Sequence, residues 1–145
     1  MKDNINGKKA FIDSFLEGAH IARLATSDRE GHPHVVPVWY AWDGESIWIS
    51  SYSSTRKINN LEENKDVSVV IDVTGGEGET KAVLFEGKAV LVKEPRDLLR
   101  DKFYWIYKRY LGEKGVLEKS PQEWIEDPQN LLIYLKPEKV FTWHW

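Results

Sequence analysis

The sequence predicts a mainly β protein in which antiparallel strands close into a barrel and helices pack around it. Three observations support this fold class. Short apolar segments of strand length recur along the 145 residues, turn-forming sequences that suit hairpins join most of them, and no Gly-x-Gly-x-x-Gly follows a strand as it does in a dinucleotide-binding sheet. The length suits one domain, residues 1–145.

Seven segments have the composition of strands. Asp43-Gly44 and the glycine-rich sequence around residues 75–78 provide hairpin turns between them. The second segment is apolar on both faces, so both faces must be covered, one by the barrel interior and the other by a helix or a second subunit. Pro37 within it cannot donate to a sheet ladder, so we expect a bulge, a sheet edge or a ligand there. Gly87 in the fifth segment indicates a bulge or a barrel corner. The segments are 21–26, 34–42, 46–51, 67–73, 81–92, 131–135 and 140–143.

Helices are predicted between and before these strands. Residues 8–17 place apolar side chains on one helical face, and Gly18 ends that helix. Pro95 opens a helix that ends at Leu111-Gly112. The sequence Ser120-Pro121-Gln122-Glu123 resembles a capping box at the start of another.

Composition excludes several classes of function. The net charge is −3 without a block of Lys or Arg, which argues against nucleic acid as a partner. No cysteine is present, so disulfides and thiolate metal sites are excluded. His32 and His34 are close in sequence but have no carboxylate cluster beside them, and we expect no metal site. No apolar run reaches the roughly 20 residues that span a bilayer, and the polar residues 1–9 do not resemble a signal peptide. We therefore expect no membrane contact and a cytoplasmic location.

The segment 50–64 has an unusual order of charges for a short helix. Arg56-Lys57 come first, whereas Glu62-Glu63 come last. Both ends oppose the helix dipole, at a cost of about 0.3–1 kcal/mol per charge. The order makes sense if an anion binds at the helix start, where hydroxyls, N–H groups and two cations gather. The alternative is that Arg56 and Lys57 are merely solvated.

The same segment resembles a known superfamily. A strand, a Ser/Thr-rich turn and Thr55-Arg56-Lys57-x-x-x-Leu61-x-x-Asn64 are similar to the phosphate-binding turn of the pyridoxamine 5′-phosphate oxidase-like proteins. The segments 21–26 and 33–39 resemble the first two strands of these proteins. The resemblance implies a six-stranded antiparallel split β-barrel that forms a homodimer, with FMN in each of two clefts between the subunits.

The resemblance also implies a set of cofactor-binding residues. Thr55, Arg56 and Lys57 would hold the phosphate of FMN, and Ser50 and Ser51 would contact the phosphate or the ribityl chain. The backbone from Val36 through Pro37 and Val38 to Trp39 would run past the isoalloxazine ring. Two further residues complete the list, His34 lining the cleft and Trp143 approaching the ring from the second subunit.

The sequence differs from true pyridoxamine phosphate oxidases at the positions that bind the substrate in those enzymes. Those enzymes carry Arg at the position of His34 and Lys at the position of Trp39, and an Arg-x-His pair near the C-terminus. Here the chain ends Thr142-Trp143-His144-Trp145. The resemblance therefore implies cofactor binding, while the vitamin B6 activity is in doubt and no catalytic residue is assigned.

Three functions are open at this point. The first is an FMN-dependent oxidoreductase acting on a small-molecule redox substrate. The second is a reductase using the deazaflavin F420, whose acidic tail would need further cations, with Lys81 and Lys88 as candidates. The third is a non-enzymatic flavin or haem carrier, in which His34 or His144 could be an axial ligand.

Overall fold

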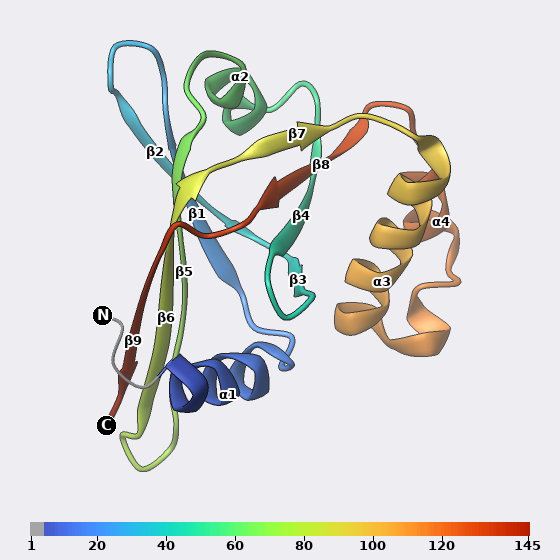
Figure 1. Ribbon diagram of the computed structural model, residues 1–145. Coiled ribbons are helices and arrows are strands. Elements are labelled where there is room, and N and C mark those ends of the chain that lie inside the picture. Colours follow the sequence, from blue (N-terminus) through green and yellow to red (C-terminus); the bar gives the residue numbers. More distant parts are fainter. Residues whose placement is uncertain (1–4) are drawn as a thin grey trace.

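A computed structural model describes residues 5–145 as two antiparallel sheets with four helices around them (Figure 1). This confirms the split-barrel fold class. The five-stranded sheet has the order β2 (Pro33–Val38), β1 (Ala22–Ser27), β5 (Asp66–Thr74), β6 (Thr80–Lys88) and β9 (Lys139–His144). The four-stranded sheet has the order β3 (Tyr40–Trp42), β4 (Ile47–Tyr52), β8 (Asn130–Leu135) and β7 (Val90–Val92).

Strands that pass from one sheet into the other make the strand count larger than expected. The predicted segment 34–42 breaks at Trp39 into β2 and β3, and the segment 81–92 breaks at Ala89 into β6 and β7. Among residues 5–145 this gives nine strands, not the seven read from the pattern or the six of the resemblance. A Cβ atom at Gly87 would lie 3.1 Å from the Leu135 side chain, so a glycine suits this second corner.

Pro37 lies on an edge strand. Its strand, β2, is at the end of the five-stranded sheet and pairs only with β1. Of the three explanations for this proline, the sheet edge is therefore confirmed, and the unbroken pairing of β2 with β1 at Arg23 and Pro37 shows no bulge. The other edge of β2 leaves backbone N–H and C=O groups outside the ladder.

The barrel interior is filled by the inward side chains of both sheets. Leu24, Ile49, Ile71 and Phe85 are fully buried there, and each such side chain contributes about 1.5–3 kcal/mol. The helices α1 (Ile5–Leu16) and α2 (Arg56–Glu63) lie at opposite ends of the barrel (Figure 1). Each contributes buried apolar side chains to the interior, namely Ile12, Phe15 and Leu16 from α1 and Ile58 and Leu61 from α2.

The remaining helices cover the four-stranded sheet. The helices α3 (Arg96–Gly115) and α4 (Lys119–Glu126) form a second apolar cluster with that sheet. Gly112 has a φ of 80° and interrupts α3, as the sequence predicts. The predicted capping box, with Ser120 at the start of the last helix, is wrong. The turn that ends α3 leads directly into α4, since the Glu118 N–H donates to the Gly115 carbonyl, and α4 starts at Lys119, before Ser120.

The outward face of the five-stranded sheet carries no helix in Figure 1. Its side chains alternate with the buried ones along each strand. Val35 is 62% exposed and Trp143 is 42% exposed on this face. No helix in the described part of the chain has the length and apolar character needed to cross a bilayer.

Candidate functional site

A cavity of about 390 Å³ lies where β2 passes into β3. Pro37, Val38 and Trp39 from this crossover line it, together with Ser50 from β4 and Lys57 from α2. The structure thus brings together residues from three separate segments that the sequence proposes as cofactor contacts. Ile21 also lines the cavity. Its 41% exposure, unusual for an isoleucine, is not apparent from the sequence, so this residue was missed.

Lys57 is the charged group of this cavity. It lies in the first turn of α2 and is half-buried, and burial lowers the pKa of its ammonium below the ordinary value of 10.5. Arg56 beside it is exposed. Neither side chain has a hydrogen-bond or ion-pair partner among residues 5–145. Partial desolvation of an unpaired cation is unfavourable, so an anion at this point would stabilise the site.

The start of α2 is not capped by a side chain. Thr55 is at the N-cap position with extended backbone, but its hydroxyl makes no capping hydrogen bond. Instead the Thr55 Oγ1 donates to the Tyr52 carbonyl oxygen at 2.9 Å and lies 3.0 Å from the Ser51 Oγ. The first turn of α2 contains no acidic residue. Its N–H groups and its positive dipole end are therefore available to an anion.

A series of polar side-chain contacts leads from Asn130 through Tyr107 to Ser50. The Asn130 Nδ2 donates to the Tyr107 hydroxyl at 2.8 Å and to the Trp124 carbonyl oxygen at 3.0 Å. The Tyr107 hydroxyl in turn interacts with the Ser50 side chain, while burial raises the pKa of Tyr107. Tyr107 therefore stays protonated, and as a neutral group it can hold Ser50 at the cavity wall.

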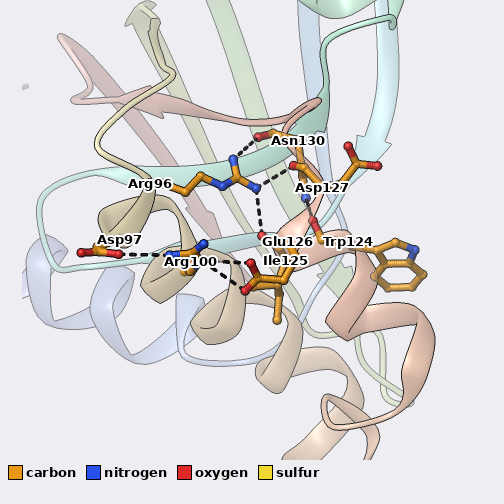
Figure 2. Close-up of polar contacts among 8 residues, drawn as sticks. All are labelled: Arg96, Asp97, Arg100, Trp124, Ile125, Glu126, Asp127 and Asn130. Atoms are coloured by element: carbon orange, nitrogen blue, oxygen red, sulfur yellow. Dashed lines mark hydrogen bonds and ion pairs between the residues drawn. The ribbon is translucent and has the colours of Figure 1, made fainter.

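Arg96 fixes the position of this series of contacts. Its guanidinium donates to three carbonyl oxygens, those of Ile125 at 2.9 Å, Asp127 at 2.6 Å and Asn130 at 3.3 Å. Figure 2 shows the side chain reaching from α3 to the end of α4 and the start of β8. The neighbouring Arg100 makes exposed ion pairs with Asp97 and Glu126. Arg96 therefore holds Asn130 in place beside Tyr107.

Trp39 forms one wall of the cavity in a fixed orientation. Its ring stacks on that of Tyr110, with centroids 4.6 Å apart and planes 3° from parallel. The Tyr110 hydroxyl accepts a hydrogen bond from the Tyr40 N–H at 3.1 Å and donates to the His20 carbonyl oxygen. Tyr110 thereby ties Trp39 to the backbone around it.

Other proposed site residues do not line this cavity. His34 is half-buried on β2 opposite Thr26, and Val36 packs against the barrel core. Ser51 is buried and its hydroxyl lies within the turn that precedes α2. Trp143 lies on β9, at the opposite edge of the sheet from β2. Within one chain it does not meet the cavity, so its proposed contact requires a second subunit.

No group of three or more His, Cys, Asp or Glu side chains that could hold a metal ion occurs among residues 5–145. The chemistry of the cavity is therefore that of a cationic helix start, a hydroxyl, an aromatic wall and an open strand edge. Such a combination suits an anionic group attached to a polar, partly aromatic molecule.

These features define a class of protein, the split barrels with a Ser/Thr-rich turn between a strand and a short helix. The family model described as pyridoxamine 5′-phosphate oxidase matches residues 9–144. The chain therefore belongs to the pyridoxamine 5′-phosphate oxidase family. Comparison with curated protein sequences gave no match.

Solved structures share the fold. A conserved hypothetical protein from Mycobacterium tuberculosis is 25% identical, with a TM-score of 0.78 over 93% of this chain and 83% of that one. An F420 reductase is 23% identical, with a TM-score of 0.66 over 89% of this chain and 94% of that one. A heme storage protein from Vibrio cholerae is 22% identical, with a TM-score of 0.71 over 90% of each chain.

Proposed function

We propose that this chain binds FMN and acts as a flavin-dependent oxidoreductase on a small-molecule substrate. The observation that carries the proposal is Lys57, a half-buried cation without a partner among residues 5–145, at the uncapped start of α2 and on the wall of the cavity. A phosphate is the group that this position suits best, because it combines with both the cations and the helix N–H groups.

The proposed roles of the remaining site residues follow from their positions. Arg56 and Lys57 bind the phosphate together with the N–H groups of the first turn. Ser51 and Thr55 shape that turn through their shared hydrogen bond, and Ser50 faces the ribityl chain. The open edge of β2, from Val36 to Trp39, offers backbone groups to the isoalloxazine ring.

The residues that line the cavity provide binding and orientation. When bound, the flavin supplies the redox chemistry. Trp39, held by Tyr110, lines the cavity with an aromatic ring at the position where the resemblance places a Lys in true pyridoxamine phosphate oxidases. This supports a substrate that differs from pyridoxamine phosphate, and we assign no catalytic acid or base.

We also propose that two copies form a dimer through the outward face of the five-stranded sheet. That face exposes Val35 and Trp143, and by strand alternation it also carries Val70, Leu84 and Phe141. The Arg23–Asp72 ion pair lies beside Val70 on the same face. Exposed apolar patches of this kind mark interaction sites. In such a dimer Trp143 of the partner subunit could reach a cofactor that the first chain holds.

FMN fits this chain better than F420. The acidic tail of F420 would need additional cations, yet Lys88 is paired with Asp66 at 2.6 Å and Lys81 lies 3.8 Å from Glu79. Both candidate cations therefore already face carboxylates. The F420 reductase is below 25% identity, and its likeness supports the fold only.

A haem carrier is supported less well. His144 is stacked on Phe11 and lies 2.9 Å from Glu79, and His34 does not line the cavity. Neither histidine is thus placed as an open axial ligand beside the Lys57 cavity.

The experiment that tests the function presents the purified chain with FMN, F420 and haem in separate titrations. We expect FMN alone to bind at one molecule per chain, with its absorption bands shifted, and the bound flavin to be reduced anaerobically by a nicotinamide. If F420 binds more tightly than FMN, F420 and not FMN is the cofactor of this protein. A Soret band of coordinated haem without flavin binding would overturn it.

A further inference from the structure

A second and larger cavity lies at the α1 end of the barrel. It has a volume of about 810 Å³ and is bounded by α1, the turn between β3 and β4, and the connection from β8 to β9. Its lining residues are different from those of the Lys57 cavity. The helices α1 and α2 lie at opposite ends of the barrel (Figure 1), so the two cavities belong to different ends of the fold.

Apolar side chains from four separate elements line this cavity. Ile12 of α1 and Phe85 of β6 are buried, and Val140 of β9 is half-buried. The ring of Trp42 in β3 stacks on that of Phe85, with centroids 5.0 Å apart and planes 12° from parallel. Because the packing of the barrel holds these side chains in place, the cavity is preformed, and an apolar cavity of this size is typical of small-molecule sites.

The polar groups next to this lining already have partners within the protein. The Trp42 Nε1 donates to the Asp13 Oδ1 at 2.8 Å. The Lys9 ammonium donates to the Asp13 Oδ2 at 2.7 Å and to the Gly44 carbonyl oxygen at 2.9 Å. The indole N–H, the carboxylate and the ammonium therefore bind within the protein and need no ligand to satisfy them.

Charges of both signs surround the opening of the cavity. Lys8 donates to the Val140 carbonyl oxygen at 2.8 Å. Lys139 alternates with Val140 along β9 and is opposite Glu86 in the β6–β9 ladder, so its side chain lies on the outward face of the sheet. With Asp13 included, the other charged residues at the cavity are three lysines and three carboxylates, namely Lys8, Lys9, Lys136, Asp13, Glu45 and Glu138. The cavity therefore favours neither an anion nor a cation.

The apolar lining and the balanced charges together determine the chemistry of a ligand. An apolar molecule gains free energy when it leaves water for such a lining. A charged molecule would lose its hydration without finding an unpaired group of opposite sign, which is unfavourable. We propose that this cavity is a second ligand site, which binds an uncharged, largely apolar small molecule with an aromatic or other cyclic body.

Three naphthalene derivatives of matched shape test the chemistry of the ligand, on protein first saturated with FMN so that the Lys57 cavity is filled. The compound 1-naphthalenemethanol is uncharged, 1-naphthoate is an anion and 1-naphthylmethylammonium is a cation. We expect isothermal titration to show the alcohol binding at one molecule per chain. It should bind about threefold or more tightly than either ion, because burying a charge without a partner is unfavourable.

The location is read from the indole N–H signals of ¹⁵N-labelled protein, in which W42F and W39F assign the signals of Trp42 and Trp39. We expect the alcohol to shift the Trp42 signal and to leave that of Trp39 in place. The variant V140F places a larger ring in the cavity and should weaken binding of the alcohol about tenfold. Its matched control is V73F, because Val73 is also a half-buried valine packed on the barrel core but does not line the cavity. V73F should bind the alcohol like the wild type.

Four results would overturn the proposal: no binding of the alcohol, equally tight binding of either ion, a shift of Trp39 in place of Trp42, or equal affinities in V140F and V73F. A Trp42 signal that moves with protein concentration and not with the alcohol would show that a second copy of the chain covers the cavity, which also excludes the ligand. If V140F does not fold, the Trp42 shift and the three affinities of the wild type still decide. A failure of FMN to bind would concern the proposed function alone, because the titration can then be run on the chain without cofactor.

Discussion

The ring of Trp39 lies parallel to that of Tyr110, 4.6 Å away between centroids. Tyr110 also uses its hydroxyl to bind the Tyr40 N–H and the His20 carbonyl oxygen. One residue of α3 therefore fixes both the strand crossover at Trp39 and the aromatic wall of the cavity. The two roles can be separated by mutation.

The variants Y110F and Y110L distinguish the hydroxyl from the ring. Y110F leaves the Tyr40 N–H without its partner and should cost about 1–3 kcal/mol of stability, while the stack on Trp39 remains. Y110L also loses the aromatic pair, about 0.5–1.5 kcal/mol more. In denaturant unfolding and FMN titration, we expect Y110F to keep its FMN affinity within about twofold and Y110L to lose several-fold. Equal affinities in the two variants would argue against an orienting role for the stack.

We expect the charged Lys57 to lower the stability of the folded, cofactor-free protein. Burial lowers the pKa of Lys57 below 10.5, so the unfolded chain binds this proton more strongly and the charged lysine destabilises the folded state at neutral pH. The penalty is present below the folded-state pKa and is lost as the pH rises from there toward 10.5. K57M should therefore raise the Tm of the cofactor-free protein by roughly 1–3 °C and lose this pH dependence.

The matched control for K57M is R56M. Arg56 is exposed, so its replacement should leave the Tm unchanged while it weakens FMN binding. Thermal unfolding from pH 7 to 10.5 measures both variants. A K57M protein that is less stable than the wild type would show that Lys57 has a structural role instead.

Arg96 and Arg100 offer a second matched pair (Figure 2). Arg96 binds three carbonyl oxygens between α3, α4 and β8, so R96M should cost about 2–4 kcal/mol and should loosen Asn130 beside Tyr107. Arg100 makes exposed ion pairs, and R100M should cost below about 1 kcal/mol. Urea unfolding measures both, and similar losses would contradict the role given to Arg96.

The dimer prediction is tested on the open sheet face. V35E places a charge on that face, whereas L117E places one on the connection between α3 and α4, where Leu117 is 63% exposed. We expect V35E to be monomeric by light scattering and to lose FMN binding, and L117E to remain dimeric. A monomeric V35E that binds FMN with wild-type affinity would exclude a cofactor cleft shared by two subunits.

Much of this fold was accessible from the sequence because local patterns determine it. Alternating apolar residues, the Asp43-Gly44 turn and the interruption at Gly112 depend on neighbours in the chain, and the structure confirms them. The corner between β6 and β7 was expected from Gly87. The break at Trp39 was missed because it arises where a strand leaves one sheet for the other, which is decided by pairing with distant strands. The start of α4 was misplaced because the preceding turn determines it.

The site was only partly accessible for the same reason. The reversed charges of Arg56-Lys57 and Glu62-Glu63 pointed to the helix start, and the resemblance led to Trp39 and Ser50. The contributions of Tyr107, Tyr110, Asn130 and Arg96 come from α3 and β8, far away in sequence. These residue types are common in any helix or strand. Only their packing in the structure shows that they position Ser50 and Trp39 at the cavity.

If the start of α2 holds a phosphate, the protein must distinguish FMN from riboflavin, because riboflavin is the same flavin without that group. Isothermal titration of the wild type should show FMN binding about a hundredfold or more tightly than riboflavin, as two charge-assisted contacts imply. In R56Q/K57Q the difference should nearly vanish, with the Tm not reduced. Equal binding of the two flavins by the wild type, or an unchanged preference for FMN in the double variant, would contradict the account.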